Sequence, residues 1–225
     1  MKIRYVIAID GPSGAGKSTI ARELARKLGY RYIDTGAMYR AAALAAERQG
    51  VSLDDAGAMA ALAPRLVIGQ EMAGGNLITL LDGEDVSKAI RRADMGLKAS
   101  AISALPLVRE RLTELQRRMG KQGGVVMEGR DIGTVVFPDA DYKFFLVASA
   151  RERARRRSEE LKQKGENIDP SKVLADLQKR DYDDATRAVA PLRRAPEAIE
   201  IDSTARTIEE VVEEILRRMG FSGAA

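Results

Sequence analysis

A glycine-rich segment, flanked by an apolar run and a helical pattern, constrains the fold of this chain more than any other feature. The run Tyr5–Ile9 (YVIAI) is short and β-branched, as in a strand that is buried on both faces. Gly11–Gly16 follows, and Lys17–Leu28 then places apolar residues at helical spacing up to Gly29, a residue type that commonly ends helices. The succession of strand, tight turn and helix predicts the start of an α/β fold.

Strand-like and helix-like segments continue to alternate along the 225 residues. Further strands are expected at Tyr30–Asp34, Leu77–Leu81, Val125–Met127, Tyr142–Val147 and Ile199–Asp202. Further helices are expected from Thr35, as the capping residue, to about Gln49, and at about Asp54–Ala63, Pro106–Met119, Ala150–Lys164, Ser171–Tyr182 and Ile208–Met219. This alternation predicts a mainly parallel sheet covered by helices, and the turn signals beside Leu77–Leu81 predict an inserted α+β lobe.

The absence of cysteine and histidine removes much of the chemistry that a chain can otherwise perform. Disulfides, thiolate nucleophiles, Cys/His zinc sites and Ser-His-Asp triads are excluded, so any metal must be held by oxygen atoms, which favours Mg²⁺. No stretch approaches the ~18 uncharged apolar residues of a membrane helix, and Asp10 interrupts the apolar run that a secretory signal needs. We therefore expect a cytoplasmic protein without membrane contact. The net charge of +4 is mild and does not by itself indicate nucleic-acid binding.

The segment Gly11–Ser18 (GPSGAGKS) fits the motif G-x-x-x-x-G-K-[ST] at every fixed position. Its glycines let backbone N–H groups turn toward a phosphate, and the following helix points its positive end at the same anion. Lys17 is expected to reach the β- and γ-phosphates of ATP, and the Ser18 hydroxyl to ligate Mg²⁺. The alternative is a turn without a ligand, which the flanking strand and helix count against. The residues expected to hold ATP are Gly11, Pro12, Ser13, Gly14, Ala15, Gly16, Lys17, Ser18 and Thr19.

The rest of the sequence narrows the reaction that such a loop supports. No guanine-reading Asn-Lys-x-Asp is present. Val125–Glu128 resembles the apolar strand ending in an acid that positions Mg²⁺ in ATPases, but a buried strand running into a turn explains it equally. An acceptor that is itself a phosphate needs no side chain to act as a general base, because its oxygens are already ionised near neutral pH. Catalysis then consists of holding two polyanions in line, which predicts several arginines converging on the loop.

Four blocks of the sequence closely resemble bacterial cytidylate kinases: Ile9–Lys17, Asp34–Arg40, Gly129–Pro138 and Arg187–Leu192. The resemblance spans nearly the whole chain. It implies an α/β P-loop kinase core, with a parallel sheet flanked by helices, an inserted α+β monophosphate-binding lobe and a helical, arginine-rich lid. It also implies transfer of the γ-phosphoryl group of ATP to CMP or dCMP, with Mg²⁺. We expect a single domain over residues 1–225, with the core at about 1–38 and 100–225, the lobe at about 39–99 and the lid at about 150–187.

The same resemblance implies roles for individual residues. The family positions that hold the CMP phosphate correspond to Arg40, Arg130 and Arg187, and Thr35 stands where the family often has serine. The positions that read cytosine correspond to Ser100, Arg109 and Asp131, those that contact the sugar to Arg180 and Asp184, and those in the lid to Arg153 and Arg157. The expected catalytic residues are Lys17, Arg130, Arg187, Arg153 and Arg157.

The base-reading residues suit cytosine chemically. Asp131 can accept a hydrogen bond from the exocyclic amine, and Arg109 can donate to N3 or O2. Uracil carries a carbonyl in place of the amine, so that two acceptors would face each other, at a cost of about 1–3 kcal/mol. The site is therefore expected to prefer cytosine to uracil.

Several alternatives remain at this stage. Asp131 can instead cap the turn that follows it. Arg153 and Arg157 share a helix with Glu152–Arg156 and Arg155–Glu159 pairs at i,i+4 spacing, so a solvated charged helix explains the segment as well as a lid does. The acceptor can be UMP, AMP or a small metabolite, or the chain can be a P-loop ATPase stimulated by nucleic acid. The low aromatic content of 4% argues against that last class, and we expect a monomer that binds no nucleic acid.

Overall fold

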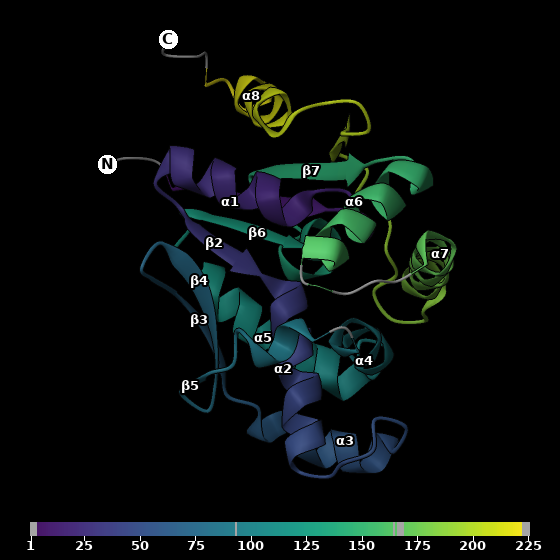
Figure 1. Cartoon of the computed structure of the whole chain (residues 1–225). Helices are drawn as coiled ribbons and strands as arrows, with labels where there is room; N and C mark the ends of the chain where they lie inside the picture. The colour runs from purple at the N-terminus through teal and green to yellow at the C-terminus, as the bar shows by residue number, and fades with distance from the viewer. Residues whose placement is uncertain (1–3, 93, 164, 166–168, 222–225) are drawn as a thin grey trace. The chain divides into compact units, whose positions relative to one another are not determined.

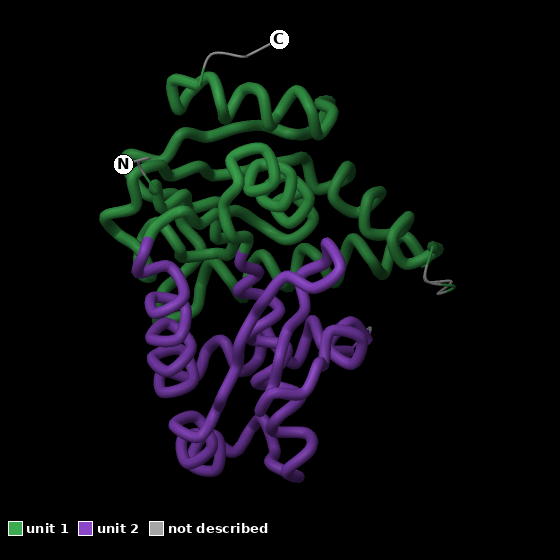
Figure 2. Tube along the Cα trace, turned by 90° about the vertical axis from the view of Figure 1, so that its left-hand side faces the viewer, with its two compact units in different colours: residues 1–32, 123–225 green, residues 33–122 purple. Residues whose placement is uncertain are grey.

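A computed structural model of the chain describes residues 4–92, 94–163, 165 and 169–221 (Figure 1). The chain forms two compact units, of which unit 1 comprises residues 1–32 and 123–225, and unit 2 comprises residues 33–122 (Figure 2). Across the described residues, every helix is too short or too polar to cross a lipid bilayer.

A five-stranded sheet lies at the centre of unit 1, and strand β2 leads from it into unit 2. The order of the strands is β2-β6-β1-β7-β8. Strand β1 pairs in parallel with β6 and β7, and β7 pairs in parallel with β8. The strands are β1 (Val6–Asp10), β2 (Arg31–Asp34), β6 (Val125–Gly129), β7 (Tyr142–Val147) and β8 (Ile199–Asp202).

Helices flank this sheet, as the alternating sequence pattern predicts (Figure 1). Helix α1 packs against β6 and α8, and α6 packs against α7. Gly29 ends α1 in the left-handed conformation, with φ of 67°, which a residue with a side chain rarely adopts. The helical elements of unit 1 are α1 (Lys17–Leu28), the π-helical turn η3 (Ile132–Val136), α6 (Ala150–Gln163), α7 (Pro170–Thr186) and α8 (Ile208–Arg218).

Unit 2 is built around helix α2, whose alanines 41–43, 45 and 46 are buried. A three-stranded sheet of order β3-β4-β5 packs against α2, and so do α4 and α5. Small alanine side chains allow these neighbours to approach closely. The elements of unit 2 are α2 (Thr35–Arg48), α3 (Ala56–Leu62), η1 (Ala63–Arg65), β3 (Ile68–Ala73), β4 (Asn76–Leu81), β5 (Glu84–Asp85), η2 (Ala89–Arg91), α4 (Met95–Ile102) and α5 (Pro106–Gly120).

The prediction that Thr35 caps its helix is wrong. The cap of α2 is Asp34, whose Oδ1 accepts a hydrogen bond of 2.8 Å from the backbone N–H of Ala37. Thr35 is the first helical residue and is buried. The helix predicted to end at Lys164 is described to Gln163, and Lys164 lies outside the described residues.

Candidate active site

The glycine-rich loop leaves the carboxyl end of β1, in the middle of the sheet, and leads into α1. Its first glycine, Gly11, has φ of 145°, and a Cβ atom there would lie 2.1 Å from the carbonyl oxygen of Leu146. Gly14 and Gly16 have φ of 78° and 87°. Backbone conformation and close packing therefore require the motif glycines, as they do in phosphate-binding loops.

Lys17 lies at the start of α1 and is buried, with 5% of its surface exposed. Its Nζ donates a hydrogen bond of 2.6 Å to the carbonyl oxygen of Pro12, across the loop. Burial, followed by the nearby charge of Arg130, lowers the pKa of Lys17 well below its ordinary value, and Glu128 opposes the shift. A buried ammonium group beside another cation gains strongly from an anionic ligand.

The register of the sheet places a second segment beside the loop. Asp10, the last residue of β1, lies opposite Gly129, the last residue of β6. The two carboxylate oxygens of Asp10 accept hydrogen bonds, each 2.8 Å long, from the backbone N–H groups of Ile132 and Gly133. Asp10 therefore holds the backbone directly after Arg130 and Asp131.

This contact bears on the alternative role of Asp131. Asp131 occupies the capping position of η3, but in the described part of the chain its side chain makes no capping hydrogen bond. The first N–H groups of the turn go to Asp10 instead. Asp131 is buried, with 5% exposure, and the turn that follows it does not depend on its carboxylate for a cap.

Arg130, Asp131, Asp184 and Arg187 form one largely buried ionic cluster in unit 1, in which the Arg130 side chain is the most exposed, at 19%. Arg130 Nε donates to Asp184 Oδ2 at 2.9 Å, and Arg187 Nη1 lies 3.5 Å from Asp184 Oδ1. Arg187 Nη2 lies 3.8 Å from Asp131 Oδ1. Burial opposes the ionised form of Asp184, but Arg130, Arg180 and Arg187 outweigh it and hold the pKa of Asp184 below its ordinary range.

Arg180 joins this cluster to the loop, because its Nη1 lies 3.5 Å from the hydroxyl of Ser13. Three predicted substrate arginines, Arg130, Arg180 and Arg187, thus gather around Asp184 beside the glycine-rich loop. A cluster of this kind keeps guanidinium groups oriented for bidentate phosphate contacts.

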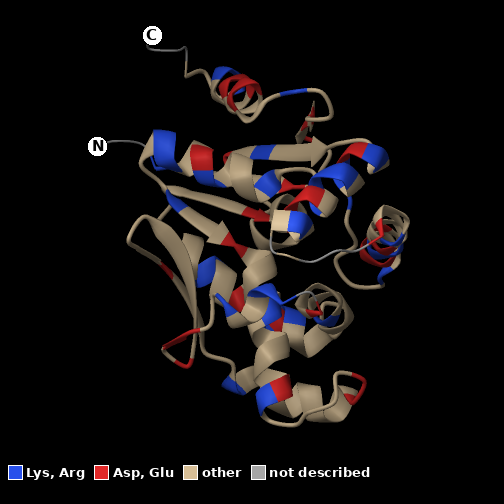
Figure 3. Ribbon diagram, in the orientation of Figure 1, with Lys and Arg blue, Asp and Glu red and all other residues tan. Residues whose placement is uncertain are grey.

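Helix α6 carries the predicted lid arginines, among side chains of both charges (Figure 3). Arg153 is buried, and its Nη1 donates to the carbonyl oxygen of Ser13 at 3.0 Å and to Asp181 Oδ2 at 2.6 Å. Arg157 is more exposed and pairs with Glu160 on its own helix at 2.7 Å. Arg153 therefore holds the loop itself, whereas Arg157 can turn to a ligand at little cost.

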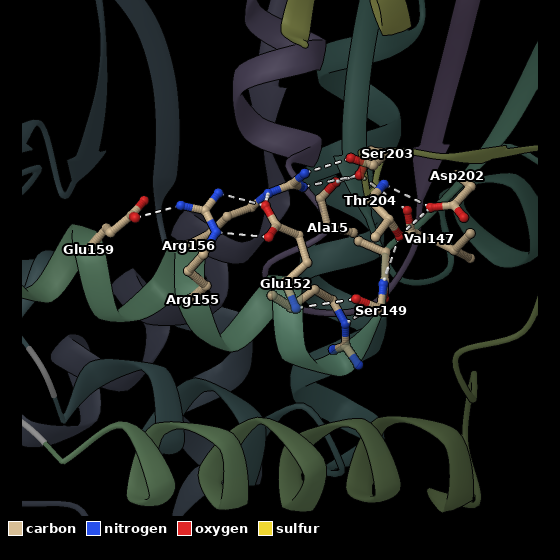
Figure 4. Close-up of polar contacts among 12 residues, drawn as sticks. Ala15, Val147, Ser149, Glu152, Arg155, Arg156, Glu159, Asp202, Ser203 and Thr204 are labelled. Atoms are coloured by element: carbon tan, nitrogen blue, oxygen red, sulfur yellow. Dashed lines mark hydrogen bonds and ion pairs between the residues drawn. The ribbon is translucent and has the colours of Figure 1, made fainter. Parts of the chain in front are cut away.

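Arg156, on the same helix, forms a second link to the loop (Figure 4). Its Nη1 and Nη2 donate to Ser203 Oγ at 3.1 Å and to the Ser203 carbonyl oxygen at 2.6 Å. Ser203 Oγ in turn donates to the carbonyl oxygen of Ala15 at 3.0 Å. The sequence prediction that Glu152 and Arg156 form an i,i+4 pair is confirmed, with Nε and Oε1 2.8 Å apart.

The other four predicted substrate residues lie in unit 2. Arg40 pairs with Asp34 at 3.1 Å, and the residue after Asp34, Thr35, is buried. Arg109 is buried, donates to the carbonyl oxygen of Ser103 at 3.0 Å, and lies 5.5 Å above the ring of Tyr39. Ser100, the fourth of these substrate residues, lies on α4 and is half-buried.

The residues present fit Mg²⁺ bound together with a nucleotide. The side chain of Ser18 is exposed at the start of α1. Within the described ranges, no group of three acidic side chains is arranged to hold a metal ion. Mg²⁺ commonly takes one or two protein ligands and completes its octahedron with phosphate oxygens and water.

Sequence reasoning missed three structural features: Asp10, the Arg156–Ser203 pair, and Gln70, whose Oε1 accepts from the backbone N–H of Asp34 at 3.0 Å. A carboxylate at the end of a buried strand, directly before Gly11, is a signal that points to Asp10. Gln70 lies 36 positions from its partner Asp34, and Arg156 lies 47 positions from its partner Ser203. No local pattern indicates either pairing.

The fold and the loop together define a P-loop kinase. A shikimate kinase from Bacteroides thetaiotaomicron shares the fold, with a TM-score of 0.50, 13% identity, and coverage of 97% of this chain and 99% of that one. An uncharacterized protein from Eubacterium ventriosum gives a TM-score of 0.53 at 13% identity, with coverage of 97% and 100%. At these identities the likeness concerns the fold alone.

Sequence comparison identifies the particular family. The family model for cytidylate kinase matches residues 7–220. A cytidylate kinase from Syntrophotalea carbinolica is 52% identical over 217 residues, covering 96% of this chain and 92% of the relative. One from Symbiobacterium thermophilum is 52% identical over 214 residues, covering 94% of each. The chain belongs to the cytidylate kinase family, as the resemblance of its four sequence blocks predicts.

Proposed function

We propose that this chain transfers the γ-phosphoryl group of ATP to CMP or dCMP, giving ADP and CDP or dCDP. The observation that carries the proposal is the buried cluster of Arg130, Arg187, Asp131 and Asp184, which lies beside the phosphate-binding loop. Family membership points to the same reaction.

The reaction is an in-line displacement between two phosphates. An ionised oxygen of the CMP phosphate attacks the γ-phosphorus of ATP, and the bond to the β,γ-bridging oxygen breaks. Lys17, Arg130 and Arg187 neutralise the charge spread over the transferred group, and Arg40 holds the acceptor phosphate with them. No proton has to be removed from the nucleophile, so these cations perform the catalysis by position and charge.

The lid arginines divide into two roles. Arg153 is committed to Ser13 and Asp181, and so acts mainly by fixing the loop. Arg157 carries the direct contact with the donor phosphates, because its exposed pair with Glu160 exchanges readily for a phosphate. Ser18 would hold Mg²⁺ when the nucleotide is bound, and the ion would supply further neutralisation of phosphate charge.

The preference for cytosine follows from the polar side chains assigned to contact the base of the acceptor nucleotide. Asp131 accepts from the exocyclic amine of cytosine, Arg109 donates to its ring acceptors, and Ser100 supplies a further hydroxyl. Arg180 and Asp184 contact the sugar, and Thr35 lies by the acceptor phosphate. Uracil would set a carbonyl against the Asp131 carboxylate, and two acceptors that face each other form no hydrogen bond.

A panel of acceptors tests the proposal. ADP formation is measured with CMP, dCMP, UMP and AMP at matched concentrations. We expect kcat/KM for CMP to exceed that for UMP by at least about tenfold, the factor that one unpaired buried polar group of 1–3 kcal/mol provides. Equal values for CMP and UMP would contradict the cytosine assignment. ATP turnover stimulated by RNA or DNA but not by CMP would contradict the reaction itself.

The remaining expectations concern the setting of the enzyme. We propose a cytoplasmic monomer whose partners are the two nucleotides, without nucleic acid. The absence of cysteine agrees with a reducing compartment.

A further inference from the structure

The carboxylate of Asp34 connects two functional features of unit 2. Its Oδ1 caps helix α2 through the N–H of Ala37, at 2.8 Å. Its Oδ2 accepts from Arg40 Nη2 at 3.1 Å, two turns along the same helix. The position of Asp34 therefore fixes both the start of α2 and the direction of the Arg40 guanidinium.

Gln70, on strand β3, holds the backbone of Asp34 with both ends of its carboxamide. Gln70 Oε1 accepts from the Asp34 N–H at 3.0 Å, and Gln70 Nε2 donates to the Asp34 carbonyl oxygen at 2.8 Å. The same Nε2 lies 3.3 Å from the hydroxyl of buried Thr79 on β4. A side chain that satisfies both backbone groups of one residue imitates a neighbouring strand and locks that residue in place.

The guanidinium of Arg40 lies at the end of the contacts that run from Gln70 through Asp34, and it is closely confined there. A Cβ atom at Gly36 would lie 3.3 Å from Arg40 Nη1 and 3.2 Å from Asp34 Oδ1, so the glycine makes room for the pair. Arg40 Nε is buried and has no hydrogen-bond partner among the residues that the structure describes. A buried, unpaired N–H on an oriented guanidinium is a donor ready for an anionic ligand.

We propose that Gln70 is a positioning residue for the acceptor phosphate: it fixes Asp34, and through Asp34 it orients Arg40. The inference rests on the proposed function, in which Arg40 holds the phosphate of CMP. It gives the inserted sheet β3-β4-β5 a role in that site, because Gln70 and Thr79 belong to two of its strands. Gln70 itself does not touch the substrate.

The test compares Gln70→Ala with Glu71→Ala, a matched truncation at the exposed neighbouring position on β3. Successive residues of a strand face opposite sides, so the control leaves the contacts with Asp34 untouched. We expect Gln70→Ala to raise KM for CMP about tenfold and to leave KM for ATP within about twofold. Cytidine lacks the phosphate, so its inhibition constant against CMP is expected to change less than about twofold.

A double-mutant cycle with Arg40→Ala identifies the route of the effect. If Gln70 acts through Arg40, Gln70→Ala adds less than about twofold to KM for CMP in the Arg40→Ala background. If Gln70→Ala is poorly folded, Gln70→Glu replaces it, since it keeps the shape and sets an oxygen against the Asp34 carbonyl.

Two results would overturn the inference while leaving the proposed function in place. One is an equal loss of affinity for CMP and cytidine in the Gln70 variant, as a merely structural residue would give. The other is a full additional loss in the Arg40→Ala background. An unchanged KM for CMP in Arg40→Ala alone would instead overturn the phosphate assignment of Arg40, and the inference with it.

Discussion

At the scale of single residues, Asp10 shows how one buried carboxylate links two parts of a site. It ends β1 directly before the first loop glycine, and its oxygens hold the turn after Arg130 and Asp131. Burial, with Asp131 nearby, raises the pKa of Asp10 from an ordinary 3.8 to about 6, although the two N–H bonds and Lys17 favour the ionised form. The geometry of the site thus depends on a charge that is costly to bury.

This pKa makes a prediction about stability. Between about pH 4 and pH 6 the folded state binds a proton on Asp10 that the unfolded state has released. The contribution of Asp10 to the free energy of unfolding therefore falls as pH rises through that window, by at most about 3 kcal/mol, and is constant above it.

Urea unfolding of the wild type and of Asp10→Asn across this window measures the effect. The stability of the wild type relative to the variant should decrease as pH rises, because the asparagine does not titrate. Asp139→Asn, at an exposed position after η3, controls for the loss of one carboxylate. A flat difference would show that Asp10 titrates as an ordinary surface carboxylate, and one of opposite slope would show that folding lowers its pKa.

The residues proposed to carry the chemistry were identified from the sequence, whereas the residues that support them were not. Lys17 is given by the loop motif. Arg130 and Arg187 lie in blocks that resemble the family, and the structure places both in the cluster around Asp184. Asp34 and Gln70 act through contacts between segments far apart in sequence, and hydrogen-bond partners at such separations leave no local pattern. The cap of α2 was missed for a different reason: Asp34 and Thr35 are adjacent, both residue types cap helices, and the structure shows that Asp34 accepts from the Ala37 N–H.

At the scale of elements, helix α6 shows why the sequence favoured a solvated charged helix and a functional lid equally. Its outer face carries Arg155, which pairs with Glu152 and Glu159 at i,i+3 and i,i+4 spacing. Its inner face carries Arg153 and Arg156, which reach the glycine-rich loop directly or through Ser203 (Figure 4). One helix thus serves both as a solvated surface and as a support for the loop.

Two truncations on α6 separate these faces. Arg156→Ala removes two hydrogen bonds from a charged donor to Ser203, and we expect it to lower the free energy of unfolding by about 1–3 kcal/mol. Arg155→Ala, at a side chain that is 56% exposed, should cost no more than about 0.5–1 kcal/mol. Urea unfolding of both variants provides the measurement. Equal losses would mean that the contact between α6 and Ser203 contributes nothing specific.

Some elements were predicted to the residue, whereas the strongly amphipathic helix α8 ends at Arg218 and not at Met219. Lys17–Leu28, Tyr142–Val147 and Ile199–Asp202 have the bounds that the sequence indicates. Helix α4 (Met95–Ile102) has a glycine in its first turn and little apolar periodicity, so it was not predicted. The turn η3 has the β-branched sequence IGTVV, which favours a strand, but hydrogen bonds to Asp10 hold it as a helical turn.

At the scale of the whole molecule, the predicted fold class and family are confirmed. The account that joins them is electrostatic: a glycine-lined anion cradle and a set of oriented guanidinium groups bring two phosphates together, without a side chain that removes a proton. Arginines suit this task because each offers a planar fork of donors that stays charged when buried. The sequence indicates which arginines are expected to take part, and the structure shows the ion pairs that hold three of them.

A crystal structure with CMP and a non-hydrolysable ATP analogue tests this claim most directly. We predict that the CMP phosphate oxygens lie within about 3 Å of guanidinium nitrogens of Arg40, Arg130 and Arg187, and that the γ-phosphate lies within the same distance of Lys17. A CMP phosphate bound away from these three arginines would contradict the account.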